Sequence, residues 1–218
     1  MPREEPPEKN WQSSALRATA AILERTLVYR AWQAPFAEQK FAPVARTNEL
    51  SKARRVLDVA CGPGTNTKYF SGTDYLGVDV NEKYIRDARR RHGRNFMVAD
   101  ARQLGRTVLV GQQPFDFILI NSFLHHVDTK DSLEVLASLD SILAPGGHIH
   151  ILELVLPEDR GMAHFLARWD RGNFARSLPE WQALFSQVFA QMFFEPYSVG
   201  AMGTTLWNMV YFKGKSRK

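Results

Sequence analysis

The sequence predicts an α/β protein in which a mainly parallel β-sheet carries helices on both faces. Three observations lead to this fold class. Short apolar runs alternate with amphipathic helical segments between residues 55 and 156. The runs are almost continuously apolar, as in strands that are buried on both faces. A tight turn, Cys61-Gly62-Pro63-Gly64, closes the first run in the manner of a strand-to-helix turn.

The composition is that of a globular domain. The chain has 218 residues, of which 44% are apolar and 23% charged, and this excludes a disordered, collagen-like or disulfide-rich chain. The single cysteine, Cys61, allows no intrachain disulfide, so we expect a cytoplasmic location. No apolar stretch approaches the ~20 residues of a membrane span. The charged, proline-rich residues 1–8 lack the apolar core of a signal peptide.

The formal charge of +5 is concentrated in two places. Arginines gather between residues 89 and 94, around the end of a predicted helix, where cations complement the helix dipole. The other cluster is the tail, residues 213–218. We therefore expect a small-molecule partner rather than a nucleic acid.

The elements before the sheet read as helices. Residues 1–10 are expected to be a disordered lead, and residues 11–53 to form N-terminal helices that act as a cap or lid. A stripe at Leu16, Ala20, Leu23 and Leu27 marks the first helix, which Pro35 ends or kinks. A second short helix is predicted from Pro43 to about Ser51.

The main domain is expected over residues 54–218. The predicted strands are residues 55–60, 75–80, 96–100, 115–121 and 148–156. Helices are expected at 82–92 and around 133–143, with Pro145-Gly146-Gly147 breaking the second. After Pro157 the alternation stops. A helical insertion at about 157–190 and a hairpin of two closing strands, 192–199 and 205–213, complete the domain.

Three features fall at consecutive strand ends, where open α/β sheets bind ligands. The glycine turn lets a ligand approach the backbone, and a helix beginning after it would offer N–H groups to an anion. Asp79 ends the second strand and can accept hydrogen bonds from both hydroxyls of a ribose. Asp100 ends the third and can accept one from the exocyclic amine of adenine. Each feature taken alone has an ordinary structural explanation. The turn could simply join a strand to a helix, and either aspartate could simply cap a helix.

Other nucleotide-binding motifs fit poorly. A dinucleotide site would have a third glycine where Thr67 stands, and the Gly-Lys-Ser/Thr of a P-loop is absent. The run Asp58-Val59-Ala60-Cys61-Gly62-Pro63-Gly64 instead resembles the first motif of the class I S-adenosylmethionine-dependent methyltransferases. Gly77-Val78-Asp79, Val98-Ala99-Asp100-Ala101 and residues 115–121 resemble the second, third and fourth motifs. Leu143-Ala144-Pro145-Gly146-Gly147 resembles the turn before the fifth strand.

The resemblance implies a Rossmann-like sheet of seven strands with the last one antiparallel. It also implies S-adenosylmethionine as cofactor and S-adenosylhomocysteine as product. The glycine turn would pack against the methionine part, Asp79 would hold the ribose and Asp100 the adenine, while Asp58 would orient the amino group directly or through water. The full set of cofactor residues that we expect is Asp58, Ala60, Cys61, Gly62, Gly64, Asp79, Val80, Asp100, Ala101, Asn121, Ser122 and Phe123.

His125 and His126 follow the fourth strand directly. Histidine side chains titrate near neutrality, so either could take the proton of a hydroxyl acceptor, although a His-His pair here can also be structural. We favour His125, which the nearer strand end is expected to expose. His148 and His150 share one face of the fifth strand without a cysteine, so no metal site is expected.

The acceptor should contact the segments outside the shared core. Candidate substrate residues there are Tyr29, Trp32, Arg171 and Phe174. We expect a methyltransferase acting on a small molecule, most readily on a hydroxyl oxygen. The alternatives are methylation of RNA or protein and a non-catalytic, cofactor-binding regulatory module. The run Asn121-Ser122-Phe123-Leu124 differs from the Asn/Asp-Pro-Pro-Tyr pattern of base and amide methylases. The oligomeric state is not predicted.

Overall fold

The computed structural model describes residues 34–158, 163 and 173–218. The chain divides into two units, Met1–Gln39 and Lys40–Lys218. In the first unit, Ala34–Phe36 form a 3-10 turn. Helix α2 spans Ala37–Thr47, and from Lys40 onward it belongs to the second unit. The helical stripe predicted at residues 16–27 lies outside the described residues.

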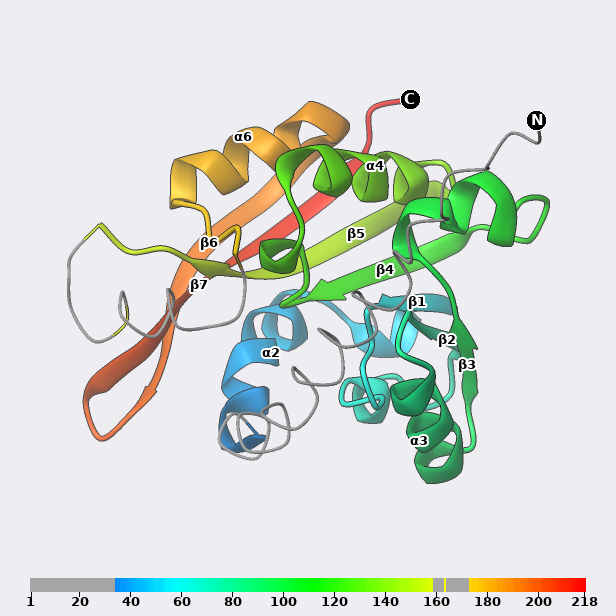
Figure 1. Cartoon of the computed structure of the whole chain (residues 1–218), viewed down its shortest axis with the longest axis horizontal. Coiled ribbons are helices and arrows are strands. Elements are labelled where there is room, and N and C mark those ends of the chain that lie inside the picture. The colour runs from blue at the N-terminus through cyan, green and yellow to red at the C-terminus, as the bar shows by residue number, and fades with distance from the viewer. Residues whose placement is uncertain (1–33, 159–162, 164–172) are drawn as a thin grey trace, which may run out of the picture. The chain divides into compact units, whose positions relative to one another are not determined.

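The second unit is built on a seven-stranded sheet in the order β3-β2-β1-β4-β5-β7-β6 (Figure 1). Strands β1 to β5 run parallel to one another, and β7 is antiparallel to both β5 and β6. This confirms the predicted sheet and its antiparallel last strand. The strands are β1 Arg55–Val59, β2 Asp74–Asp79, β3 Asn95–Val98, β4 Phe115–Asn121, β5 Leu143–Val155, β6 Phe189–Ala201 and β7 Thr204–Ser216.

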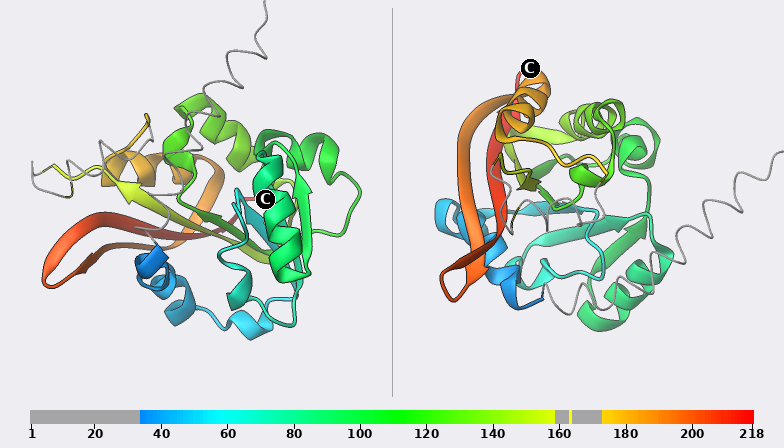
Figure 2. Two further views of the ribbon diagram at one scale, coloured as in Figure 1. Left: turned by 60° about the horizontal axis from the view of Figure 1, so that its bottom comes forward. Right: turned by 60° about the vertical axis from the view of Figure 1, so that its left-hand side comes forward.

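Helices cover both faces of the sheet, as Figures 1 and 2 show. Helices α4 (Thr129–Asp140) and α6 (Leu178–Val188) lie on one face, and α2 and α3 (Glu82–His92) lie on the other. Each face buries its own apolar cluster. Leu136 and Trp181 belong to the first cluster, and Phe41 and Ile85 to the second. Successive residues of β4 and β5 contribute to opposite clusters, which explains why these strands are apolar throughout.

The helices begin and end at the residues that the sequence signals. The side chain of Asn81 accepts hydrogen bonds at the start of α3, and Gly93, with φ 57°, ends it in the left-handed conformation. Asp128 caps α4, and Ser177 and Glu180 form a capping box at α6.

The prediction of a helix after the glycine turn is wrong. Beyond Gly64 the chain forms only a 3-10 turn, η3 (Thr67–Tyr69), before β2 begins. Thr and Asn residues compete with helical hydrogen bonding, and here the side chain of Asn66 is bound to Asp58 instead. The turn therefore presents no helix N-terminus to a ligand.

Two proline-based predictions are also wrong. Helix α2 runs through Pro43 instead of starting there, because Phe41 and Val44 are buried on its inner side and packing outweighs the missing N–H. The Pro145-Gly146-Gly147 run does not break a helix, since α4 ends at Asp140. It lies within β5 and shifts the register between β4 and β5, with Gly146 at φ 76°.

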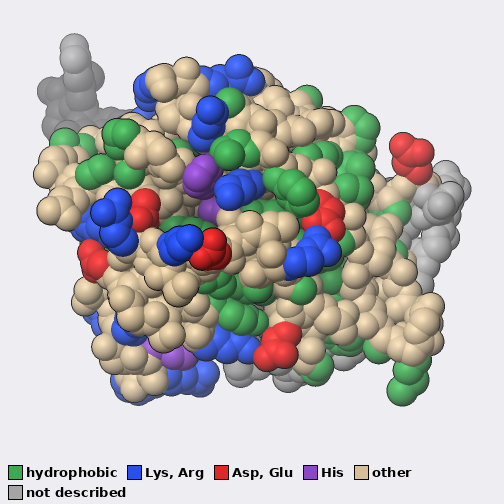
Figure 3. Space-filling model, turned by 180° about the vertical axis from the view of Figure 1, so that it is seen from behind, with side chains coloured by type: hydrophobic (Ala, Val, Ile, Leu, Met, Phe, Trp, Pro, Cys, Tyr) green, Lys and Arg blue, Asp and Glu red, His purple; other side chains and the backbone are tan. Residues whose placement is uncertain are grey.

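The surface carries charges of both signs. On the face shown in Figure 3, lysine and arginine side chains stand among acidic and apolar ones rather than forming one continuous basic area. Several of the cations are paired, as in the contacts of Arg46 with Glu195 and of Lys218 with Asp140. Among the described helices, none combines the length and apolar character needed to cross a membrane.

Candidate active site

The carboxyl ends of β1 and β2 are joined by the side chain of Asp79. The backbone N–H of Gly62 donates to Oδ2 of Asp79 at 2.9 Å, and that of Asn81 donates to Oδ1 at 2.8 Å. The N–H of Cys61 donates to the carbonyl of Val78 at 3.0 Å, which continues the β1–β2 pairing into the turn. The structure thus brings together the glycine turn and the acidic residue that the sequence places 17 positions apart.

The turn after β1 is a left-handed stretch of backbone. Ala60, Gly62 and Gly64 have φ values of 55°, 56° and 82°. A Cβ added to Gly62 would meet no atom within 4 Å, whereas one added to Gly64 would come within 2.8–3.0 Å of His92 and Phe96. Gly62 therefore faces open space, and Gly64 allows close packing inside the protein. Open space against a bare backbone fits a bulky ligand that lies along the turn.

Asp58 lies beneath this turn. Its side chain is fully buried and accepts hydrogen bonds from the hydroxyl of Tyr75 at 2.7 Å and from Nδ2 of Asn66 at 3.3 Å. Burial raises the pKa of Asp58 to about 7. The hydrogen bonds from Tyr75 and Asn66 act in the opposite direction, and the nearby charge of Asp79 raises the pKa further. The role expected for Asp58, orienting the amino group of the cofactor directly or through water, stays a prediction, and Tyr75 and Asn66 fix the position of its carboxylate.

At the end of β3, Asp100 is held by a cation. Arg102 donates to it at 2.7 Å and reaches Asp131 at 3.2 Å. The hydrogen bonds from Arg102 lower the pKa of Asp100, which also caps the short helix that starts at Ala101. A carboxylate has room for further donors, so this pairing leaves the predicted role open.

The end of β4 carries the polar residues Asn121 and Ser122. Nδ2 of Asn121 donates to Oδ1 of Asn66 at 3.2 Å, and the hydroxyl of Ser122 donates to Oδ1 of Asn121 at 3.2 Å. Ser122 has a φ of 58°, which is uncommon for a residue other than glycine. The sharp turn after Ser122 leads into the segment that contains the two histidines.

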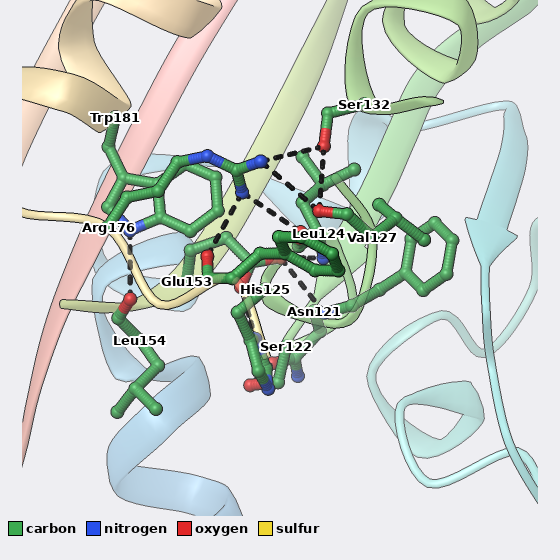
Figure 4. A network of polar contacts seen from close by, with 12 residues as sticks. Asn121, Ser122, Leu124, His125, Val127, Ser132, Glu153, Leu154, Arg176 and Trp181 are labelled. Carbon is green, nitrogen blue, oxygen red and sulfur yellow. Dashed lines mark hydrogen bonds and ion pairs between the residues drawn. The ribbon is translucent and has the colours of Figure 1, made fainter. Parts of the chain in front are cut away.

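His125 is buried and bound to a carboxylate (Figure 4). Its Nδ1 lies 2.7 Å from Oε2 of Glu153, and the exposed fractions of the two side chains are 2% and 0%. The backbone N–H groups of Phe123 and Leu124 donate to the other oxygen of Glu153 at 2.9 and 2.6 Å. Burial favours a higher pKa for Glu153, but His125 and the two N–H groups lower it below its ordinary value. The expectation that His125 is the exposed histidine is wrong. His126 is exposed, and its ring centroid is 4.1 Å from that of His125.

Arg176, which lies within the predicted insertion just before α6, ties this segment to the histidine loop. Its guanidinium is buried and donates to the carbonyls of Leu124 and Val127 at 3.1 Å, and it lies 4.7 Å from the ring of Trp181 (Figure 4). The N–H of Phe174 donates to the carbonyl of His125 at 3.1 Å. Phe174, a predicted substrate residue, therefore lies beside the histidine loop, with its side chain 39% exposed.

Each of the remaining predicted residues is exposed, buried or outside the described residues. Val80 is 74% exposed beside Asp79, and Cys61 is buried, with burial the main cause of its raised pKa. Ala101 packs in the core. Tyr29, Trp32 and Arg171 lie outside the described residues. Within the part of the chain that is described, no group of three His, Cys, Asp or Glu side chains could hold a metal ion.

Three residues that matter for this geometry were missed at the sequence level: Asn66, Glu153 and Arg176. Each is a polar residue in an apolar or turn segment, and the odd acidic residue within the fifth apolar run was the one usable signal. A charged residue inside a strand that is buried on both faces must have a partner. The partner's identity depends on which loop the fold places above that strand.

Comparison with known proteins gives a consistent result. Residues 56–147 match the family model described as a methyltransferase domain. The trans-aconitate 2-methyltransferase of Delftia acidovorans is 29% identical over 133 residues, covering 57% of this chain and 47% of that protein. The ubiquinone biosynthesis O-methyltransferase of Methylococcus capsulatus is 30% identical over 100 residues, 44% of this chain and 41% of that protein. The chain thus spans less than half the length of each of these curated relatives.

A solved structure supports the fold. The N-methyltransferase NodS of Bradyrhizobium japonicum, in complex with S-adenosyl-L-homocysteine, superimposes with a TM-score of 0.66 at 15% identity, covering 84% of this chain and 89% of that one. The match of the domain model covers β1 to β4 and the start of β5, the strands whose ends form the site. Residues 56–147 thus carry a methyltransferase domain, on the seven-stranded sheet that the resemblance to the class I S-adenosylmethionine-dependent methyltransferases implies.

Proposed function

We propose that the protein transfers a methyl group from S-adenosylmethionine to a hydroxyl oxygen of a small molecule. The observation that carries the proposal is the contact of Asp79 with Gly62, which sets a carboxylate beside an open stretch of backbone at the carboxyl edge of the sheet. The named relatives that act in trans-aconitate and ubiquinone chemistry support a small acceptor.

The cofactor, when bound, supplies an activated methyl group with a good leaving group. Asp79 would hold the ribose hydroxyls, and the backbone of Ala60 to Gly62 would lie along the methionine part. Val80, Asp100 and Ala101 would border the adenine. Asn121, Ser122 and Phe123 would line the cofactor at the end of β4. Gly64 and Asp58 would support the turn from inside, because both are packed against protein groups.

The protein's own chemical task is to align the acceptor and take its proton. We assign the proton to His126, since it is the exposed one of the two histidines. His125, with Glu153, holds the loop that carries it. Phe174 would contact the acceptor, and we keep Tyr29, Trp32 and Arg171 as candidate acceptor contacts. We keep a cytoplasmic location as part of the proposal, because a chain with a single cysteine suits a reducing compartment.

The first test is calorimetric titration with S-adenosylhomocysteine, using NAD as the comparison ligand. Binding of S-adenosylhomocysteine alone supports the cofactor assignment. Binding of neither ligand would favour a non-catalytic module and overturn the proposal. With binding established, a screen with labelled methyl donor over small hydroxyl compounds, protein and tRNA identifies the acceptor class. Retention of tRNA at about 0.15 M salt would favour a macromolecular acceptor.

The histidine assignment has its own pair of variants. We expect His126→Asn to lower kcat about 100-fold, the lower end of the range for a general base, with unchanged S-adenosylhomocysteine affinity. His125→Asn should instead lower the stability of the protein. Equal kcat values for His126→Asn and the wild type would exclude His126 as the proton acceptor.

A further inference from the structure

We propose that Asp58 and Asn66 are positioning residues that fix the orientation of the Asn121 carboxamide at the β4 edge of the cofactor site. The inference rests on the proposed function, because it concerns what Asn121 presents to ligand. Asp58 lies on β1, Asn66 in the turn after it and Asn121 at the end of β4. The chain of contacts between them leads from a fully buried carboxylate to a partly exposed amide.

The direction of every hydrogen bond in this chain follows from its buried end. Tyr75 donates its hydroxyl to Oδ2 of Asp58 at 2.7 Å, and the Asp58 carboxylate, in the ionised form that prevails above about pH 7, can only accept. Asn66, 3.3 Å away, must therefore turn its Nδ2 toward Asp58. This leaves Oδ1 of Asn66 as the acceptor for Nδ2 of Asn121 at 3.2 Å.

The consequence appears at the exposed end. With its Nδ2 committed to Asn66, Asn121 keeps Oδ1 for the hydroxyl of Ser122, 3.2 Å away, and for a donor on the ligand. At the end of β4 the site therefore offers a hydrogen-bond acceptor, Oδ1 of Asn121, which suits an N–H or O–H group of the ligand. A neutral amide at position 58 could reverse the chain, because an amide can donate as well as accept. Asn121 would then present N–H groups instead.

Burial protects these hydrogen bonds from exchange with water. Asn66 is 7% exposed and Asp58 is not exposed, so water has little room to replace either contact. Buried amides that lose a partner leave an unsatisfied group at high cost. The three side chains therefore keep one set of directions.

The test exchanges the two buried groups. Asn66→Asp sets two carboxylates against each other, and Asp58→Asn removes the group that sets the direction. The double variant Asp58→Asn/Asn66→Asp restores it, with Asn at 58 accepting from Tyr75 and donating to Asp at 66, which accepts from Asn121. Controls are Asn95→Asp and Asp74→Asn, which make the same changes at exposed positions on β3 and β2.

Two readouts are followed at matched folded fraction. We expect each single variant to bind S-adenosylhomocysteine about tenfold more weakly, and the double variant to return to within about threefold of the wild type. Nitrogen-edited NMR should show the Asn121 side-chain amide unchanged in the double variant and shifted in Asp58→Asn. Recovery of stability without recovery of binding would overturn the inference, as would an Asn121 amide signal that is the same in all proteins.

The two proposals fail in different ways. If the wild type does not bind S-adenosylhomocysteine, the proposed function fails, and the NMR signal of Asn121 still reports whether Asp58 sets the orientation. If the wild type binds and all variants bind equally, the inference alone is wrong.

Discussion

Nδ1 of His125 lies 2.7 Å from Oε2 of Glu153, and the two side chains are buried between the β4 end and strand β5. Glu153 also accepts the N–H groups of Phe123 and Leu124, so one carboxylate stabilises three successive residues of the loop. The loop that carries His126 is thus anchored from the core of the sheet.

Replacing Glu153 with Gln should test this anchor. The amide keeps one acceptor but places N–H groups against N–H donors, so we expect a loss of about 2–3 kcal/mol in the free energy of unfolding. The matched control is Glu195→Gln, which removes the charge of a surface pair with Arg46 and should cost less than about 1 kcal/mol. Urea unfolding measures both. Equal effects would contradict the anchoring role.

Asp79→Ala should weaken S-adenosylhomocysteine binding by about 1.5–3 kcal/mol, the range for hydrogen bonds to a charged group. The variant also loses the tie between Gly62 and Asn81, so part of the effect reflects a looser turn. Asp74→Asn, at the exposed start of the same strand, serves as the control. Calorimetry that gave the wild-type affinity for Asp79→Ala would remove Asp79 from the site.

Gly62→Ala and Gly93→Ala form a matched pair. Their φ values are 56° and 57°, and a Cβ at either position would meet no atom within 4 Å. Both should lose about 1–2 kcal/mol of stability through backbone strain alone. Only Gly62→Ala should also weaken cofactor binding, because its Cβ would enter the open space along the turn. Similar affinities for the two variants would place the ligand elsewhere.

The stability of the protein should depend on the ionisation of Asp58. Its pKa is raised by burial from 3.8 to about 7 in the folded state, so the folded protein binds a proton more tightly than the unfolded chain. The proton on Asp58 therefore stabilises the folded state fully below about pH 4. This stabilisation is lost as the pH rises through about 7, at about 1.4 kcal/mol for each unit between the two pKa values.

Comparison with Asp58→Asn isolates this effect, since the other titrating groups are common to both proteins. Between about pH 5 and about pH 7 the wild type should lose stability relative to the variant, and above about pH 7 the difference should stay constant. Denaturant titrations at several pH values measure the difference. Parallel pH profiles would show that Asp58 does not titrate in this window.

Local sequence was enough for the sheet and for the meeting of Gly62 and Asp79 at one edge of it. The apolar runs at residues 55–60 and 115–121 became β1 and β4 almost unchanged, because a strand buried on both faces needs apolar residues throughout. Gly62 and Asp79 could be placed at one edge because the carboxyl ends of adjacent parallel strands coincide. The hairpin of β6 and β7 was also predicted, although both strands are longer than expected.

The course of the chain at Pro43 and after Gly64 could not be predicted from the neighbouring residues in the sequence. Whether a helix starts at Pro43 or runs through it depended on the burial of Phe41 and Val44, which the neighbouring sheet provides. The missing helix after Gly64 depended on the bond between Asn66 and Asp58, which the folded turn brings within reach.

By itself, the sequence determined the α/β class, the strand order along the chain, the glycine turn and the acidic strand ends, since each depends on residues close together in the chain. Tertiary structure alone decided which side chains lie inside. His125 is buried because Glu153, 28 residues away, meets it across β4 and β5, and Asn66 orients Asn121 across 55 residues. Polar side chains in a core take partners from whichever strands and loops the packing of apolar residues brings together, and that packing is a property of the whole fold.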